Sequence, residues 1–177
     1  MKAFIFFTIS LIIFTACKTQ QDAMTKAAMA AEQKIGYEKA VRAINDREFI
    51  LEADKITFRY GRFTYVNANT NFISLHGDKA TIQMAFNSPY AGPNGIGGIT
   101  VDGTASNMKV ATDKKGTVTF SMSVQGIGVS ADVSIQMYKD SNQCSAEINP
   151  NFNSNRINFS GNLYPEAESN VYKGRAL

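Results

Sequence analysis

The stretch that decides the fold is residues 117–138, which read TVTFSMSVQGIGVSADVSIQMY. Apolar and polar side chains alternate strictly on both sides of the break at Gly126-Ile127-Gly128. A period of two residues is typical of a β-strand with one apolar face and one polar face, so each half predicts such a strand. The positions expected on the inner face are Val118, Phe120, Met122, Val124, Val129, Ala131, Val133, Ile135 and Met137.

Shorter segments with the same alternation flank this pair. Polar turn residues separate the segments, as at Asp140-Ser141-Asn142. Alternation that is polar on one side indicates antiparallel strands with one face on the core and one in water. We therefore expect a mainly β domain of about eight strands, either an antiparallel sandwich or a partly closed barrel. The further strands are expected at 49–58, 72–75, 80–86, 99–105, 108–111, 144–148 and 156–163.

The first 16 residues have the pattern of a lipoprotein signal peptide. Lys2 supplies a positive charge, an apolar stretch runs from Ala3 to Phe14, and Phe14-Thr15-Ala16-Cys17 resembles a bacterial lipobox. The apolar run is short for a bilayer core about 30 Å thick. The pattern predicts cleavage before Cys17 and lipidation of its thiol, and several acyl chains anchor a protein firmly. The alternatives are an uncleaved anchor and an ordinary signal peptide.

Residues 17–46 are expected to form a lipidated tether followed by a helix. Good helix formers dominate from Asp22, a suitable N-cap, to Asp46, with no Pro and one Gly. The apolar stripe on this helix is thin, which favours a spacer over a packed element. The β domain is then expected at 47–170, with a tail at 171–177.

Composition excludes several classes of protein. The 177 residues suit one domain, and 44% apolar residues with a net charge of +3 exclude disorder as the main state. Two cysteines exclude a disulfide scaffold. With Cys17 committed to lipid, Cys144 has no partner in the chain, and its place in an alternating segment predicts burial as a small hydrophobe.

Catalytic and metal-binding motifs are not recognisable. The single histidine, His76, stands in a Gly-Asp turn, and no nucleophile motif accompanies it. One histidine and one spare cysteine make no zinc set. We therefore expect no enzyme, no cofactor, no metal and no nucleic-acid partner.

Two segments remain as candidates for binding. The segment RYGRFTY at 59–65 interleaves basic and aromatic side chains, which suits contact with a sugar or a protein, or simply a strand with an aromatic outer face. A glycine-dense loop is either a backbone cradle or lid, or a connection that needs glycine for positive φ angles. The residues proposed for this binding loop are Pro93, Asn94, Gly95, Gly97 and Gly98.

Three motifs together resemble a known family. They are NFISLHGDKA at 71–80, GGITVDG at 97–103 and NRINFSGNL at 155–163. In this order after a lipobox, they resemble a family of small Bacteroidetes lipoproteins known only as a domain of unknown function. The resemblance covers about residues 47–163, implies one all-β domain on a lipid tether, and carries over no catalytic residue.

The sequence thus favours a non-enzymatic cell-envelope lipoprotein with a binding or interaction role. Its partners would be the membrane, through the lipid, and a protein or small molecule. The alternative is a carrier of a small apolar ligand inside the β domain, since inward Ala80, Met84, Ala131 and Met137 leave space; a cavity of at least about 300 Å³ favours it. No acidic residue stands in 18–21, which favours an outer-membrane anchor with the domain facing the periplasm.

Overall fold

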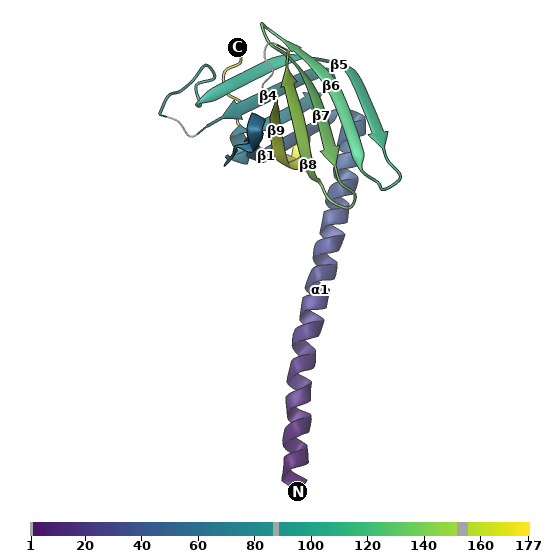
Figure 1. Ribbon diagram of the computed structural model, residues 1–177. Coiled ribbons are helices and arrows are strands. Elements are labelled where there is room, and N and C mark those ends of the chain that lie inside the picture. The colour runs from purple at the N-terminus through teal and green to yellow at the C-terminus, as the bar shows by residue number, and fades with distance from the viewer. Residues whose placement is uncertain (1, 87–88, 152–155) are drawn as a thin grey trace.

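A long helix leads into a β-barrel in the computed structural model of this chain (Figure 1). The structure describes residues 2–86, 89–151 and 156–177, with the side chains of the helix described from Met24 onward. The elements are α1 (Lys2–Asp46), β1 (Glu48–Phe58), η1 (Arg59–Gly61), β2 (Phe63–Tyr65), η2 (Ala68–Thr70), β3 (Phe72–His76), β4 (Lys79–Ala85), β5 (Gly98–Thr112), β6 (Val118–Gly126), β7 (Ser130–Met137), β8 (Gln143–Pro150), β9 (Ile157–Pro165) and η3 (Glu166–Glu168).

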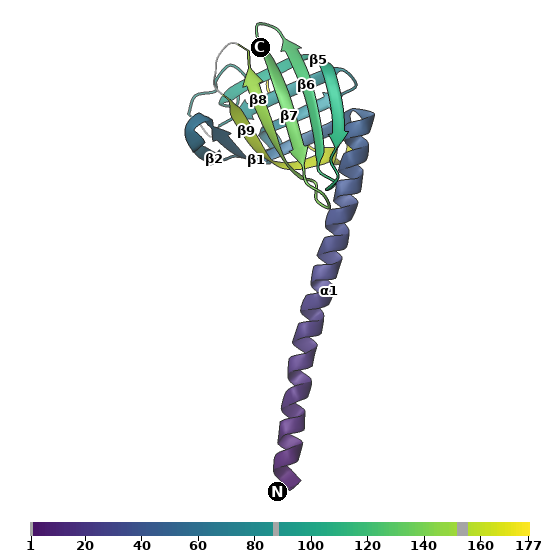
Figure 2. The same cartoon turned by 45° about the vertical axis from the view of Figure 1, so that its right-hand side comes forward.

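The sheet closes on itself. Its strand order is β2-β1-β3-β4-β5-β6-β7-β8-β9, and an additional antiparallel pairing between β1 and β9 joins the two sides. Eight strands form the closed barrel, and the short β2 pairs with β1 outside it (Figure 2). The predicted mainly β fold with a preceding helix is confirmed, and of the two architectures the chain adopts the barrel.

The inward positions expected from alternation form the core. Val118, Phe120, Met122 and Val124 of β6 are all buried, and so are the alternate residues of β7 from Ala131 to Met137. Phe120 meets Phe49 of β1 edge to face, with ring centroids 5.3 Å apart. Truncating a buried phenylalanine to alanine typically costs about 3–5 kcal/mol, so this pair is a major source of stability.

The strand expectations hold except at two places. The segments 99–105 and 108–111 form one strand, β5, whose register against β6 shifts between Ser106 and Lys109. Asn107 has a φ of 53° there, so a bulge replaces the expected break. The three-residue β2 was not expected, because a strand this short shows no alternation of its own.

The last turns of α1 cover one end of the barrel. Ala40, Ala43 and Ile44 are buried in the same core as the strands. The hydroxyl of Tyr37 donates to the carbonyl of Gly116 in the β5–β6 turn at 2.7 Å. The helix is therefore a packed element at its C-terminal end, where the sequence favoured a spacer over a helix docked on the domain.

The earlier part of α1 extends away from the barrel (Figure 1). Met24, Met29 and Ile35 are exposed there, as a spacer requires. The helix runs through Asp22, expected as its N-cap, because residues 2–35 contain neither Pro nor Gly. The signal peptide and Cys17 lie outside the residues whose side chains are described, so lipidation stays a prediction. Among the described residues, no helix is long and apolar enough to cross a membrane.

Candidate functional site: the open mouth of the barrel

The two ends of the barrel differ. At one end, where Phe49 pairs with Pro165, the turns of the sheet meet α1. At the other end, Phe58 pairs with Ile157, and the strands enclose a cavity of about 440 Å³. Its lining is Phe58, Arg59, Tyr60, Arg62, Ile82, Met84, Ile99, Val101, Val129, Ala131, Ile148, Pro150, Arg156 and Ile157.

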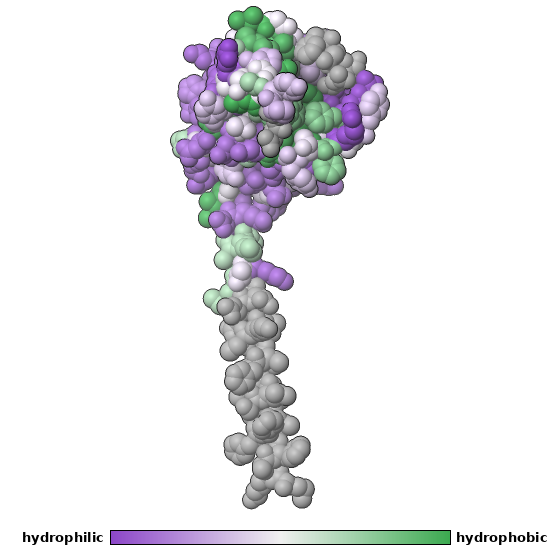
Figure 3. Space-filling view, turned by 90° about the vertical axis from the view of Figure 1, so that its left-hand side faces the viewer, coloured by the Kyte–Doolittle hydropathy of each residue, from purple (hydrophilic) through white to green (hydrophobic). Residues whose placement is uncertain are grey.

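The cavity is a continuation of the core toward solvent. Ile82, Ala131 and Ile148 are buried at its floor, whereas Ile99 is 37% exposed. The buried residues on the inward faces of the strands are apolar, and no described element covers this end as α1 covers the other. Apolar side chains therefore line a space that opens to water. Figure 3 shows a face on which apolar residues, in green, group between hydrophilic residues, in purple.

The rim is basic. Three arginines belong to the lining, Arg59, Arg62 and Arg156, and no described lining residue is acidic. An Nη1 atom of Arg156 lies 3.2 Å from a carboxylate oxygen of Glu147. Glu147 alternates with the inward Ala146 and Ile148 on β8, so it holds the guanidinium from the outer wall. The guanidinium of Arg59 lies 5.1 Å from the ring centroid of Tyr60.

Tyr60 occupies a strained turn at this rim. Its φ of 70° lies in the left-handed region, and Gly61 follows with a φ of 76°. Both belong to the three-residue turn Arg59–Gly61 between β1 and β2, which is closed by the hydrogen bond from the Phe58 N–H to the Arg62 carbonyl. Such a conformation is an outlier for a bulky residue, and strained residues of this kind cluster at functional sites. The side chain is 84% exposed, so burial does not account for the choice of tyrosine over asparagine or glycine; the ring instead lies beside the guanidinium of Arg59.

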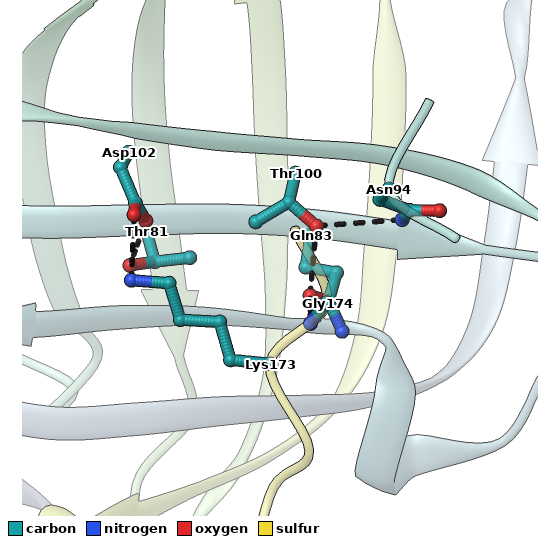
Figure 4. A network of polar contacts seen from close by, with 7 residues as sticks. All are labelled: Thr81, Gln83, Asn94, Thr100, Asp102, Lys173 and Gly174. Carbon is teal, nitrogen blue, oxygen red and sulfur yellow. Dashed lines mark hydrogen bonds and ion pairs between the residues drawn. The ribbon is translucent and has the colours of Figure 1, made fainter. Parts of the chain in front are cut away.

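A buried polar network holds the wall of the barrel from outside (Figure 4). The amide oxygen of Gln83 on β4 accepts from the Thr100 hydroxyl at 2.8 Å and from the Gly174 N–H at 2.7 Å. Its amide nitrogen donates to the carbonyls of Thr70 and Tyr172. The segment expected as a tail at 171–177 is thus fastened along β4 and β5.

An ion pair extends this attachment of the C-terminal segment. Lys173 lies 2.6 Å from an oxygen of Asp102, and the Leu177 N–H donates to the carbonyl of Thr100 at 3.1 Å. Asp102 also accepts from Thr81 at 2.7 Å (Figure 4). Short-range sequence patterns gave no signal for these contacts, because the partners are far apart in the chain.

The predicted binding loop lies outside the mouth. Asn94 is buried, and its amide oxygen accepts from the N–H groups of Ile96 and Gly98 at 3.1 and 2.9 Å. Gly95 and Gly97 donate to carbonyls of the same loop, and both have positive φ. Among the described lining residues of the cavity, Pro93, Asn94, Gly95, Gly97 and Gly98 do not occur. The binding loop stays a prediction, and these contacts support its reading as a connection.

His76 and Cys144 lie apart from the mouth. His76 is exposed at the helix end of the barrel, with Nδ1 2.7 Å from a carboxylate oxygen of Glu166, and this hydrogen bond raises its pKa above 6.5. Cys144 is buried as expected, and burial raises the pKa of its thiol to about 12. Among the described residues, no three His, Cys, Asp or Glu side chains group to hold a metal ion.

Residues 31–163 match a domain of unknown function, DUF4251. The chain belongs to the DUF4251 family. A crystal structure of a DUF4251 family protein from Bacteroides eggerthii DSM 20697 is similar over 84% of this chain and 99% of that chain, with 45% identity and a TM-score of 0.71. No curated protein matches. The family resemblance seen in the three sequence motifs is confirmed.

The mouth itself was not identified from the sequence, although parts of it were. Segment 59–65 was singled out for its basic and aromatic residues, and Arg59, Tyr60 and Arg62 belong to the rim. Of the four residues expected to leave interior space, Met84 and Ala131 line the cavity. Ala80 and Met137 are packed in the core instead. The missing information was which strand ends meet around one opening.

Proposed function

We propose that this DUF4251 protein is a non-enzymatic binding protein of the cell envelope that holds an apolar ligand in the mouth of its barrel. The observation that carries the proposal is the cavity of about 440 Å³, whose described lining is apolar apart from its rim. Ligand sites are typically apolar cavities of about 300–1,000 Å³ with a few polar groups. The volume exceeds the threshold of about 300 Å³ that favours a carrier.

Apolar surface exposed to water in the mouth is unfavourable in free energy. Each Å² of apolar surface removed from water stabilises by about 25 cal/mol, so a ligand that fills the mouth gains from every contact with Ile82, Met84 or Ile148. Small closed barrels of about eight strands either fill with side chains or hold one small ligand. Here the half nearest α1 is filled by Phe49 and Phe120, and the other half holds the cavity.

The proposal includes the tether. If Cys17 is lipidated, the anchor lies about 40 Å along the helix from the C-terminal end of α1, at the usual helical rise of about 1.5 Å per residue. Since α1 packs at one end of the barrel, the mouth lies at the end remote from the anchor. The mouth would then open into the periplasm and meet ligand there.

The test uses the chain beginning at Lys18. In the crystallised relative, a chain corresponding to 84% of this one forms the same fold, and buried residues of α1 begin at Ala40. The probe is N-phenyl-1-naphthylamine, a neutral dye whose fluorescence rises in apolar surroundings. We expect saturable enhancement by the native chain.

Variants locate the dye. Ala131→Phe places a ring in the cavity and should abolish the enhancement, while Ile127→Phe, at an 82% exposed position beside the mouth, should not. Val129→Phe serves as a second filling variant if Ala131→Phe melts without cooperativity. Absence of saturable enhancement, or equal enhancement in the filled and control variants, would overturn the proposal.

A further inference from the structure

We infer that the ligand of the mouth is a single-chain amphiphile with an anionic head, whose tail enters the cavity and whose head remains at the arginine rim. This inference rests on the proposed function and adds the chemical class of the ligand. The cavity supplies an apolar interior and a rim of one charge sign. A purely apolar ligand needs no such rim.

The arginines at the opening come from two neighbouring strand ends. The lining includes Arg59 and Arg62, which lie in and just after the turn that follows β1. It also includes Arg156, which lies just before β9. The β1 and β9 ends are hydrogen-bonded neighbours, with Phe58 opposite Ile157. The three guanidinium groups therefore belong to one sector of the rim.

One of these arginines contacts an acidic side chain. Glu147 pairs with Arg156 at 3.2 Å through one guanidinium nitrogen. A guanidinium has five N–H donors, so this contact leaves donors of Arg156 for a second acceptor. The amide of Asn149 also donates to Glu147, at 3.0 Å, which holds the carboxylate in place on the outer wall. Glu147 thus orients Arg156 and leaves part of its guanidinium available to a ligand.

The arginine rim favours an anionic head group on the ligand. Planar guanidinium groups match carboxylate and phosphate oxygens in paired hydrogen bonds, and such charge-assisted bonds are stronger than neutral ones. A head placed at the rim stays partly hydrated, so its charge is not buried at full cost. The shared chemistry is a monoanionic or dianionic oxygen head on one alkyl chain, and the experiment separates carboxylate from phosphate.

The experiment is displacement of bound N-phenyl-1-naphthylamine by decanoate, decyl phosphate and decan-1-ol, which share one alkyl chain length. We expect at least one anion to displace the dye at about tenfold lower concentration than the alcohol, since exposed ion pairs contribute up to about fivefold each. The preference should weaken as salt rises, because salt screens exposed charges. A preference for decanoate assigns a carboxylate, and one for decyl phosphate assigns a phosphate.

Variants test the rim directly. Arg62→Gln with Arg156→Gln should remove most of the preference for the anion over decan-1-ol, while Arg62→Lys should retain part of it. Arg42→Gln, on the exposed face of α1, is the matched control and should change nothing. Equal displacement by all three compounds, or an anion preference that survives the double variant, would overturn this inference while the proposed function stands. Failure of the dye to bind at all would overturn the proposed function instead.

Discussion

Replacing Gly161 by alanine tests the closure of the barrel. Gly161 lies on β9 opposite Ala53 of β1, where the register between the two strands shifts. A Cβ atom at this position would meet backbone atoms of Glu52 and lie 2.8 Å from the Cα atom of Ala53. Backbone atoms of a closed seam cannot turn aside as a flexible side chain can, so the strands must separate locally.

The magnitude follows from that contact. Overpacking in a well-packed region costs about 1–3 kcal/mol, and a clash with backbone belongs at the upper end, so we expect about 3 kcal/mol. At about 3 °C per kcal/mol for a domain of this size, the melting temperature should fall by about 10 °C. Urea unfolding followed by circular dichroism of the chain from Lys18 gives the free energy of unfolding.

The same substitution at Gly36 is the matched control. Gly36 lies in α1, and an added Cβ there meets only side-chain atoms of Asn142, the nearest at 3.6 Å, which is ordinary contact. Alanine in a helix is favoured over glycine by about 0.5–1 kcal/mol, so Gly36→Ala should stabilise the protein. If Gly161→Ala changes the free energy of unfolding by less than about 0.5 kcal/mol, within the range of ordinary surface changes, the close β1–β9 seam is wrong.

Four further outcomes are expected. Gln83→Leu leaves buried partners of both Gln83 amide atoms unpaired and should cost about 3 kcal/mol by urea unfolding; a loss below about 1 kcal/mol would contradict the network. The thiol of Cys144, whose pKa burial raises to about 12, should react with Ellman's reagent at pH 8 only after unfolding, and rapid reaction of the folded chain would refute its burial. The hydrogen bond that His76 donates to the Glu166 carboxylate raises the pKa of His76 above 6.5, so the contribution of this contact to stability is complete below pH 6.5 and is lost as pH rises through the folded pKa. NMR titration should show a lower pKa of His76 in Glu166→Gln. Cys17→Ser in the full chain should lose metabolic lipid label, because a hydroxyl does not replace the thiolate, and retention of label would place lipidation elsewhere.

Local pattern was sufficient for the strands and their inner faces. The alternation in 117–138 predicted that Phe120 and Ile135 lie in the core, because the apolar face of a strand can be recognised from the sequence of that strand alone. The alternation did not distinguish a sandwich from a barrel, because the barrel depends on the pairing of β1 with β9, which closes the sheet. These strands are separated by most of the domain, and neither one indicates its partner.

The same limit applies to the candidate site. The mouth is assembled from the ends of β1, β4, β5, β7, β8 and β9, so it exists only after closure. The sequence identified RYGRFTY as unusual, but not that Arg156 joins Arg62 at one opening. The glycine-dense loop was predicted to bind a ligand because of its composition. In the structure its N–H groups donate to the Asn94 side chain and to carbonyls of the loop itself.

In the proposed function, the filled half of the barrel supplies stability and the open half supplies the binding site. The aromatic core of Phe49 and Phe120 lies on the side that α1 covers, where truncations are costly. At the mouth, Ile99 and Arg62 are partly or fully exposed, so their replacement removes few core contacts. If the mouth binds a ligand as we propose, rim residues can change the ligand preference while the fold is retained. It follows that chemical differences between members at positions 59–62, 99 and 156 should track differences in the ligand, and differences at the α1 end should not.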